Sequence, residues 1–293
     1  MSESEPADRS SISDTTAGPI EWTLRRGPND TGSTVIVVHG GHSNCHEELG
    51  ITALVEAGHS VLVPSRPGYG RTPLSTGERA ETAADALADL VRVLDLGRVA
   101  VLGISAGGPT AIHLAVRHPK AIDRLILASA VTQIWHQPGD GRYETMQRLF
   151  GRAETAVWAM TRAMFRLAPR WMARTMMASM TDRDLDTVMA SFSDTDLDAL
   201  RQMIARQASG HGFLADLEHR VADEVLPTVV VPTLIVHSPS DAAVPFAHAE
   251  HAARSIPGAR LVEAPSPCGH LIWFGPGGEV ADAAILDFLR TTA

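Results

Sequence analysis

Ser105 stands between two glycines in the pentapeptide Gly103-Ile104-Ser105-Ala106-Gly107. A β-branched apolar run precedes this motif, and a segment of helical periodicity follows it. A sharp turn from strand to helix needs small neighbours and leaves the serine hydroxyl open to an incoming carbonyl group. We therefore predict that Ser105 is a nucleophile. The alternative is a tight turn whose serine only caps the helix.

A serine hydroxyl becomes an effective nucleophile when a base removes its proton and a carboxylate orients that base. Among thirteen histidines, His270 is the best placed, in a loop between the last predicted strand and the final predicted helix. Asp241 directly follows a predicted strand, at the kind of strand end where ligand sites of α/β sheets gather. We predict that His270 is the base and Asp241 the acid. The alternatives are a loop histidine that packs on Trp273 and an aspartate that serves as a turn residue.

The carbonyl oxygen of a substrate gains negative charge during attack, so backbone N–H donors must face it. The expected donors are Ala106, which follows the nucleophile, and a residue of the run His39-Gly40-Gly41-His42. We predict Gly41 as this second donor of the oxyanion hole, whereas an ordinary Gly-Gly turn is the alternative. The candidate substrate-binding residues are His42, Trp135 and Trp273.

Short apolar runs alternate with longer segments of helical periodicity along most of the chain. Such runs are typical of a mostly parallel sheet that helices cover on both faces, so the sequence predicts an α/β fold. The predicted strands are 20–25, 34–38, 60–63, 99–102, 125–127, 233–236 and 260–262. The predicted helices are 47–57, 78–94, 106–118, 246–255 and 278–290.

One stretch, residues 132–225, interrupts this alternation and contains no convincing strand. We predict that it forms an inserted helical cap, or lid, of about three to five helices. Capping-box patterns at Thr181–Asp184 and Ser193–Asp196 indicate helix starts, and Pro169 and Gly210 indicate breaks. The predicted domains are a disordered tail at 1–19, an α/β core at 20–131 and 226–293, and the cap at 132–225.

Four arginines recur at every fourth position in the predicted cap, among methionines and aromatic residues: Arg162, Arg166, Arg170 and Arg174. A cationic, amphipathic pattern of this kind can dock on an anionic membrane or steer an acidic substrate. The simpler interpretation, which we favour here, is a solvated arginine face above an apolar lid interior. Pro169 supports it by interrupting the helix.

His39, His42, Cys45 and His46 lie close together in the sequence and could suggest a metal site. The first two belong to the glycine run, however, and no second cluster of ligands stands out elsewhere. We predict no metal and no other cofactor.

The formal net charge of −9 and the pI near 5.8 oppose contact with phosphate backbones, so we expect no nucleic-acid partner. Two cysteines, Cys45 and Cys268, are too few for a disulfide framework and favour a cytoplasmic location. The first residues resemble no signal peptide, and no apolar run reaches the roughly 18 residues of a membrane span. We expect no integral membrane segment, and the sequence leaves open whether the chain forms a homo-oligomer.

The strand-turn-helix motif at residues 103–107, which we call the elbow, and the chain order serine, acid, histidine resemble the α/β-hydrolase superfamily. The resemblance is to its lid-bearing branch, which includes esterases, lipases and carbon-carbon bond hydrolases. Residues 64–72 resemble this family's D-x-P-G-x-G-x-S segment, with Ser65 where aspartate is commoner. Arg66 and Arg71 of this segment are candidates to shape the rim of the pocket.

The resemblance implies a serine hydrolase that cleaves a carboxylic ester or a related small, hydrophobic acyl compound through an acyl-enzyme intermediate. Ser105 argues against epoxide hydrolases and haloalkane dehalogenases, which carry aspartate at the elbow. The missing Pro-Gly after the glycine run argues against a proline iminopeptidase. A carbon-carbon bond hydrolase or lactonase on the same triad is one alternative, and a binding protein without turnover is another.

Overall fold

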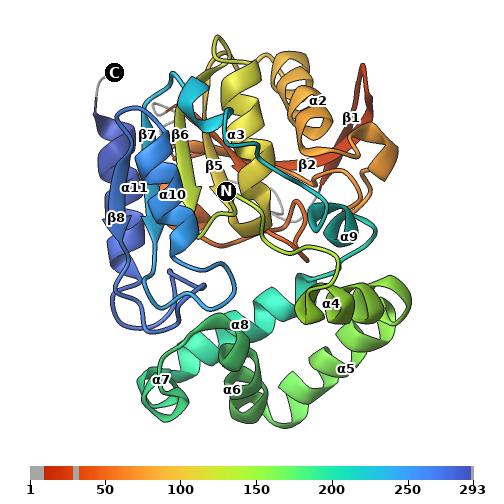
Figure 1. Cartoon of the computed structure of the whole chain (residues 1–293), viewed down its shortest axis with the longest axis vertical. Helices are drawn as coiled ribbons and strands as arrows, with labels where there is room; N and C mark the ends of the chain where they lie inside the picture. The colour runs from red at the N-terminus through yellow and green to blue at the C-terminus, as the bar shows by residue number, and fades with distance from the viewer. Residues whose placement is uncertain (1–9, 29–32, 292–293) are drawn as a thin grey trace, which may run out of the picture.

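The computed structural model describes residues 10–28 and 33–291. Its centre is an eight-stranded sheet in the order β1-β2-β4-β3-β5-β6-β7-β8 (Figure 1). Strand β2 pairs antiparallel with β1 and β4, and all other neighbours are parallel. The strands are β1 (Ser11–Thr15), β2 (Gly18–Arg25), β3 (Thr34–Val38), β4 (Ser60–Pro64), β5 (Val99–Ile104), β6 (Ile122–Ala128), β7 (Thr233–His237) and β8 (Arg260–Glu263).

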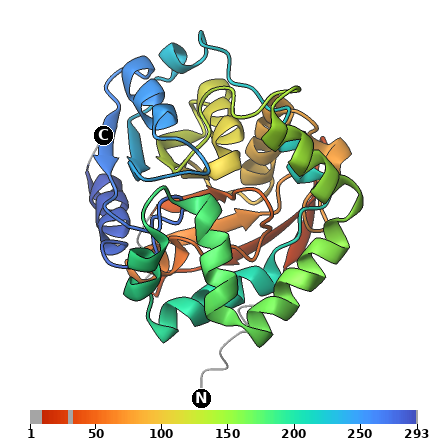
Figure 2. The same ribbon diagram turned by 60° about the horizontal axis from the view of Figure 1, so that its bottom comes forward.

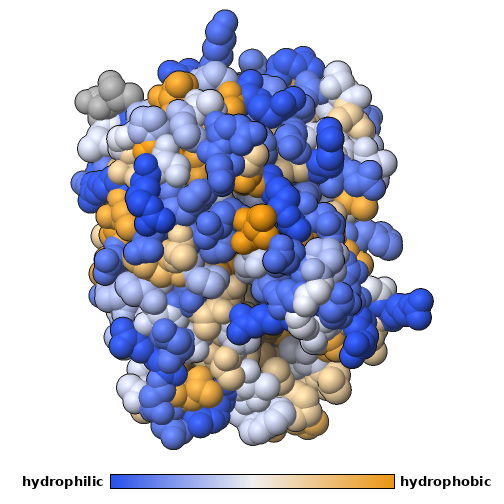
Figure 3. Space-filling view, in the orientation of Figure 1, coloured by the Kyte–Doolittle hydropathy of each residue, from blue (hydrophilic) through white to orange (hydrophobic). Residues whose placement is uncertain are grey.

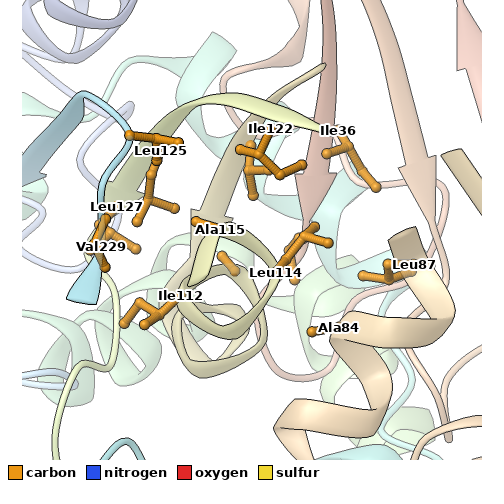
Figure 4. Packing of buried hydrophobic residues seen from close by; sticks show 14 of the residues in the cluster. Ile36, Ala84, Leu87, Ile112, Leu114, Ala115, Ile122, Leu125, Leu127 and Val229 are labelled. Atoms are coloured by element: carbon orange, nitrogen blue, oxygen red, sulfur yellow. The ribbon is translucent and has the colours of Figure 1, made fainter. Parts of the chain in front are cut away.

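Helices cover both faces of the sheet, because each central strand sends alternate apolar side chains to opposite sides. In β3, Ile36 and Val38 belong to the cluster that α2, α3 and α10 cover on one face, whereas Val35 and Val37 belong to the cluster that α1 and α11 cover on the other. Figure 4 shows the first of these clusters, in which Ile112 of α3 meets the sheet. Burial of such side chains stabilises the fold by about 1.5–3 kcal/mol each. These helices are α1 (Ile51–Glu56), α2 (Ala80–Val93), α3 (Gly108–Arg117), α10 (Ala247–Ser255) and α11 (Glu279–Arg290).

The predicted disordered tail is wrong for residues 10–19, which form β1 and the start of β2. Strand β1 is a polar edge strand that buries no side chain, so hydrophobic periodicity could not reveal it. Its backbone pairs with β2, and Ser13 Oγ accepts a hydrogen bond from Trp22 Nε1. Residues 1–9 of the predicted tail lie outside the described residues.

Six helices follow one another between β6 and β7, and we call them together the helical insertion. They are α4 (Gly141–Arg152), α5 (Glu154–Leu167), α6 (Pro169–Met180), α7 (Leu185–Ser191), α8 (Asp194–Arg206) and α9 (Gly212–Asp216). The prediction of up to five is one too low, because the short α9 has too few residues to show a helical period. The insertion lies below the sheet in Figure 1 and across its front in Figure 2. The division into a core and a cap domain stays a prediction.

One predicted helix start in the insertion is correct and the other is not. Ser193 and Asp196 form the predicted capping box of α8. Thr181 is not an N-cap: it is the C-cap residue of α6, its hydroxyl donates to the Pro267 carbonyl, and Asp184 is the N-cap of α7. The predicted break at Pro169 is confirmed, since this residue opens α6 after α5 has ended.

Three short 3₁₀ turns complete the described chain: η1 (Leu74–Thr76), η2 (Ser105–Gly107) and η3 (Leu226–Thr228). Within residues 10–28 and 33–291, none of the helices combines the length and the apolar character that a bilayer crossing needs.

Candidate active site

Ser105 lies at the turn between β5 and α3, where its backbone has a φ of 51°. Residues other than glycine rarely adopt this left-handed conformation, which costs energy and directs the side chain away from the sheet. The flanking glycines make the turn possible. A Cβ on Gly103 would collide with Ala111 of α3, and a Cβ on Gly107 would collide with the Val38 carbonyl.

His270 joins this serine to a carboxylate. Its Nε2 lies 2.9 Å from Ser105 Oγ, and its Nδ1 lies 2.8 Å from Asp241 Oδ2. Because a carboxylate only accepts hydrogen bonds, Nδ1 carries the proton and Nε2 is left to accept from the serine hydroxyl. The structure thus brings together the three residues that the sequence predicts as nucleophile, base and acid.

Asp241 accepts hydrogen bonds on both carboxylate oxygens. Oδ1 accepts from the backbone N–H groups of Ala243 and Val244, at 2.9 and 2.8 Å. Oδ2 accepts from His270 and lies 3.1 Å from His237 Nε2. Burial alone would raise the pKa of Asp241, but the charge of His270 and the hydrogen bonds from both histidines lower it to about 2. The carboxylate is therefore held in its ionised form.

His237 is a contact of the acid that sequence analysis missed. It is the last residue of β7 and is buried, and its Nε2 also lies 2.9 Å from the Val244 carbonyl. Both neighbours of this nitrogen are acceptors, so Nε2 carries a proton and donates. The available signal was its position four residues before Asp241, on the strand that presents the acid.

The glycine run after β3 lies directly against the elbow. A Cβ on Gly40 would stand 3.1 Å from Ser105 Cβ, and one on Gly41 would stand 3.8 Å from Ala106 Cβ. The two predicted oxyanion donors are thus neighbours. The ring of Phe213 in α9 packs against the glycine run, since a Cβ on Gly41 would lie only 2.9 Å from it.

A buried ion pair fixes the glycine run to the helical insertion. Arg66 donates to the carbonyl of His39 at 2.7 Å and to that of Gly40 at 3.2 Å. Its two terminal nitrogens bind the carboxylate of Asp216 in α9 at 2.6 and 2.7 Å, and Tyr69 donates to the same carboxylate at 2.5 Å. Burial would raise the pKa of Asp216, but Arg66 lowers it. The side chains of Arg66 and Asp216 are 2% and 1% exposed.

These contacts correct the expectation that Arg66 and Arg71 shape a pocket rim. The Arg66 side chain is buried and binds Asp216 and two backbone carbonyls, so it does not line a pocket rim. Arg71 is half exposed and binds Glu21 of β2 at 2.7 Å, away from the triad. The partner of Arg66 could not be recognised from sequence spacing, because Asp216 lies 150 residues further along the chain.

His42 lies in an aromatic cluster beside the elbow. Its ring stacks on Phe213 and Phe150, with centroids 3.9 and 4.4 Å away, and its Nδ1 lies 2.7 Å from Ser209 Oγ. Trp158 donates to the same hydroxyl. Burial lowers the pKa of His42 to about 3, so this imidazole is neutral at physiological pH.

The two predicted tryptophans lie in different places. Trp135 donates to the carbonyl of Ala243, two residues after the acid, and its ring meets Phe213 edge to face. Trp273 packs instead on Gly50 and lines a separate cavity of about 460 Å³ between α1 and α8. Ser105, Asp241 and His270 are absent from the lining of that cavity. The structure therefore does not bring Trp273 to the triad.

Comparison with known proteins identifies the family to which this fold belongs. The family model of the alpha/beta hydrolase fold matches residues 33–275. The chain belongs to the α/β-hydrolase family. An uncharacterised hydrolase of Bacillus subtilis, YcgS, is 38% identical over 272 residues, which cover 92% of this chain and 95% of that protein.

Several solved structures resemble this α/β hydrolase over nearly the whole chain, and some relatives are similar over a shorter stretch. An alpha/beta hydrolase fold protein from Nakamurella multipartita superposes with a TM-score of 0.80 at 25% identity, covering 96% of this chain and 99% of that one. A thermophilic esterase from Thermogutta terrifontis gives 0.73 at 26% identity, covering 96% and 98%. A 2-hydroxy-6-oxononadienedioate/2-hydroxy-6-oxononatrienedioate hydrolase of Burkholderia vietnamiensis is 31% identical over 120 residues, 37% of this chain and 41% of that protein.

This hydrolase uses the unusual Ser65 as a structural link. The Ser65 hydroxyl donates to Glu21 Oε2 and accepts from the backbone N–H of Cys45, at 3.0 Å in both cases. It thereby ties β2 to the segments that follow β3 and β4. The exchange of aspartate for serine leaves the triad untouched.

A candidate metal cluster of the described residues combines Glu21, Cys45 and His46. Arg71 donates to both Glu21 oxygens and already neutralises this carboxylate. Burial raises the pKa of Cys45 to about 11, which keeps the thiol protonated, whereas a metal needs the thiolate. His39 and His42, which lie near Cys45 and His46 in the sequence, are hydrogen-bonded to the Arg66 backbone N–H and the Ser209 hydroxyl instead. The surroundings of the cluster thus oppose a bound cation.

Proposed function

We propose that this hydrolase cleaves a carboxylic ester or a related small acyl compound through an acyl-enzyme on Ser105. The observation that carries the proposal is the continuous line from Ser105 Oγ through His270 to Asp241, with both distances below 3 Å. This arrangement lets one imidazole take the serine proton and return it to a leaving group.

In the first step Ser105 Oγ forms a bond to the carbonyl carbon while its proton moves to His270 Nε2. The ionised Asp241 stabilises the imidazolium that results. The new oxyanion is held by the backbone N–H groups of Gly41 and Ala106, and one such donor typically contributes about 2.7–4 kcal/mol to lowering the barrier.

In the second step the bond to the leaving alcohol breaks, and this group takes the proton from His270. Water then enters, gives a proton to the same Nε2 and attacks the acyl carbon. Collapse of the second oxyanion releases the acid and returns the proton to Ser105. No cofactor takes part in the proposed sequence.

The surroundings of the elbow support an uncharged, hydrophobic acyl group. Phe213 and the neutral His42 lie beside the oxyanion loop, and Trp135 lies beside the acid loop. The buried cation nearest to the loop, Arg66, is neutralised by Asp216. The likeness to the Thermogutta esterase points in the same direction.

A second candidate is a carbon-carbon bond hydrolase or lactonase on the same triad. The shorter match to the Burkholderia hydrolase favours it, and the match includes no more than 37% of this chain. A binding protein without turnover is less well supported, because it has no need for a strained serine hydrogen-bonded to an ordered histidine. Both cysteines are buried free thiols, which supports the proposed cytoplasmic location.

A fluorophosphonate probe tests the nucleophile, because it phosphonylates an activated serine and releases fluoride. Wild type should label, and Ser105→Ala should not. Ser129→Ala is a matched control: Ser129 directly follows the neighbouring strand β6 with a φ of 47°, and its buried hydroxyl has no partner in the described ranges. Equal labelling of wild type and Ser105→Ala would refute the assignment.

A substrate panel tests the reaction class. We expect turnover of p-nitrophenyl esters of graded acyl length, with a preference for uncharged acyl groups. Clean labelling by the probe without turnover of any ester, together with cleavage of a lactone or of a vinylogous diketone, would instead establish the second candidate.

A further inference from the structure

Helix α5 presents an apolar side to solvent. The α5 stripe, as we call it, consists of exposed residues that recur along one side of the helix: Ala156, Ala159, Met160, Ala163 and Leu167. Met160 and Leu167 are 63% and 81% exposed, and Trp171 continues the stripe at the start of α6 with 56%. A surface helix normally turns its polar side to water. Pale-orange and orange residues lie accordingly at the lower right of Figure 3, over the part of the insertion that Figure 1 labels α5.

The same part of the chain is strongly cationic. Residues 141–180 contain seven arginines, two glutamates and neither lysine nor aspartate, a formal charge of +5 on a chain of −9. Four of these arginines are exposed and form no ion pair within the described part of the chain. Arg142 donates to the Ala242 carbonyl, whereas the other three, Arg148, Arg152 and Arg166, form no side-chain hydrogen bond there either. Arg170 and Arg174, in contrast, contact carboxylates of the insertion. The three free guanidinium groups therefore remain available to an external anion.

We propose that the α5 stripe and these three arginines dock the protein onto an anionic lipid surface. Exposed Leu, Met and Trp side chains on successive helices that also carry unpaired arginines are typical of helices that lie in the membrane interface. An acidic polymer would match the charge but would leave the stripe in contact with water. A symmetric contact between two copies would bring the same cations face to face. The proposal concerns binding and does not depend on which bond the enzyme cleaves.

Co-sedimentation of the full chain with vesicles tests the proposal. We expect binding to phosphatidylcholine vesicles that contain about one third phosphatidylglycerol, weak binding to phosphatidylcholine alone, and loss of binding at high salt. One arginine near an anionic surface changes partitioning by about fivefold. The triple variant Arg148→Gln/Arg152→Gln/Arg166→Gln should therefore bind on the order of 100-fold more weakly.

The apolar half of the surface has its own variant, Met160→Ser/Leu167→Ser, which should also release the protein from vesicles. Val230→Ser is the matched control, because Val230 is 76% exposed at a different place. The charge control is Arg254→Gln/Arg260→Gln/Arg290→Gln, which changes three exposed arginines outside the helical insertion. Both controls should bind like wild type, and all four variants should keep wild-type turnover of a soluble ester.

Trp171 reports directly on contact. Brominated acyl chains should quench wild-type fluorescence, and Trp171→Phe should abolish most of this quenching. Equal binding of wild type and the triple arginine variant would overturn the proposal, as would equal binding to both lipid compositions. A dimer in light scattering that Met160→Ser/Leu167→Ser dissociates would also overturn it and assign the stripe to contacts between copies.

Discussion

Arg66 and Asp216 bind each other through two parallel N–H···O contacts, deep between the core and helix α9. Two further guanidinium hydrogens reach the carbonyls of His39 and Gly40. One arginine thus connects the helical insertion with the loop that carries a proposed oxyanion donor. The orientation of the His39 and Gly40 carbonyls therefore depends on Arg66, which is itself held by Asp216 of the insertion.

Arg66→Met should leave the Asp216 carboxylate buried without its partner and lower the free energy of unfolding by about 3–5 kcal/mol. The double variant Arg66→Met/Asp216→Leu should recover most of that stability, because apolar side chains can replace a buried ion pair. Its kcat should stay low, since two loop carbonyls still lack their donor. Denaturant titration and ester kinetics measure the two effects. Full recovery of kcat in the double variant would contradict a role in positioning the loop.

His237→Ala should lower kcat for ester turnover about tenfold and leave KM nearly unchanged, because Asp241 loses one of its donors. His237→Gln offers an amide N–H at a similar reach and should restore part of the loss. Phosphonylation rates give an independent measure of the same effect. If His237→Ala and wild type label at equal rates, the contact with Asp241 is only structural.

Acid should destabilise the protein through Asp241. Its pKa is lowered from 3.8 to about 2 in the folded protein, so the ionised carboxylate stabilises the fold above pH 4. This contribution, about 2 kcal/mol, disappears as the pH falls from about 4 to about 2. Unfolding free energies of wild type and Asp241→Asn should converge over this range. A constant difference between them would show that the pKa is not lowered. Asp241→Asn should also lose on the order of 10⁴-fold in kcat at neutral pH.

Gly41→Ala should reduce kcat at least tenfold, because its Cβ would meet the Phe213 ring at 2.9 Å and push the loop away from the elbow. Gly41→Ala/Phe213→Leu removes the clash and should regain activity relative to the single variant. Phe213→Leu alone serves as the control for repacking. If the double variant is no better than Gly41→Ala, the added methyl group acts through the loop backbone itself.

Local patterns were sufficient to predict seven of the eight strands, the turn at Ser105, and the His270 and Asp241 that the structure places in line with it. Strand ends and glycine turns are short-range features, and the parallel topology then brings His270 and Asp241 to the same edge. The edge strand β1 and the link from Arg66 to Asp216 could not be predicted in this way. A polar strand has no apolar signature, and a contact across 150 residues has no spacing to recognise. Trp273 shows the opposite failure, since it follows His270 closely in sequence but lines a cavity whose lining excludes the triad.

The backbone at Ser105 sets fold stability against reactivity. The described chain contains four residues other than glycine with a positive φ, and two of them, His42 and Ser105, border the site. A side chain in this conformation is disfavoured by roughly 1–2 kcal/mol relative to glycine. Ser105→Gly should therefore yield a protein that is harder to unfold and chemically inert. The proposed nucleophile therefore lowers the free energy of unfolding relative to a glycine at the same turn.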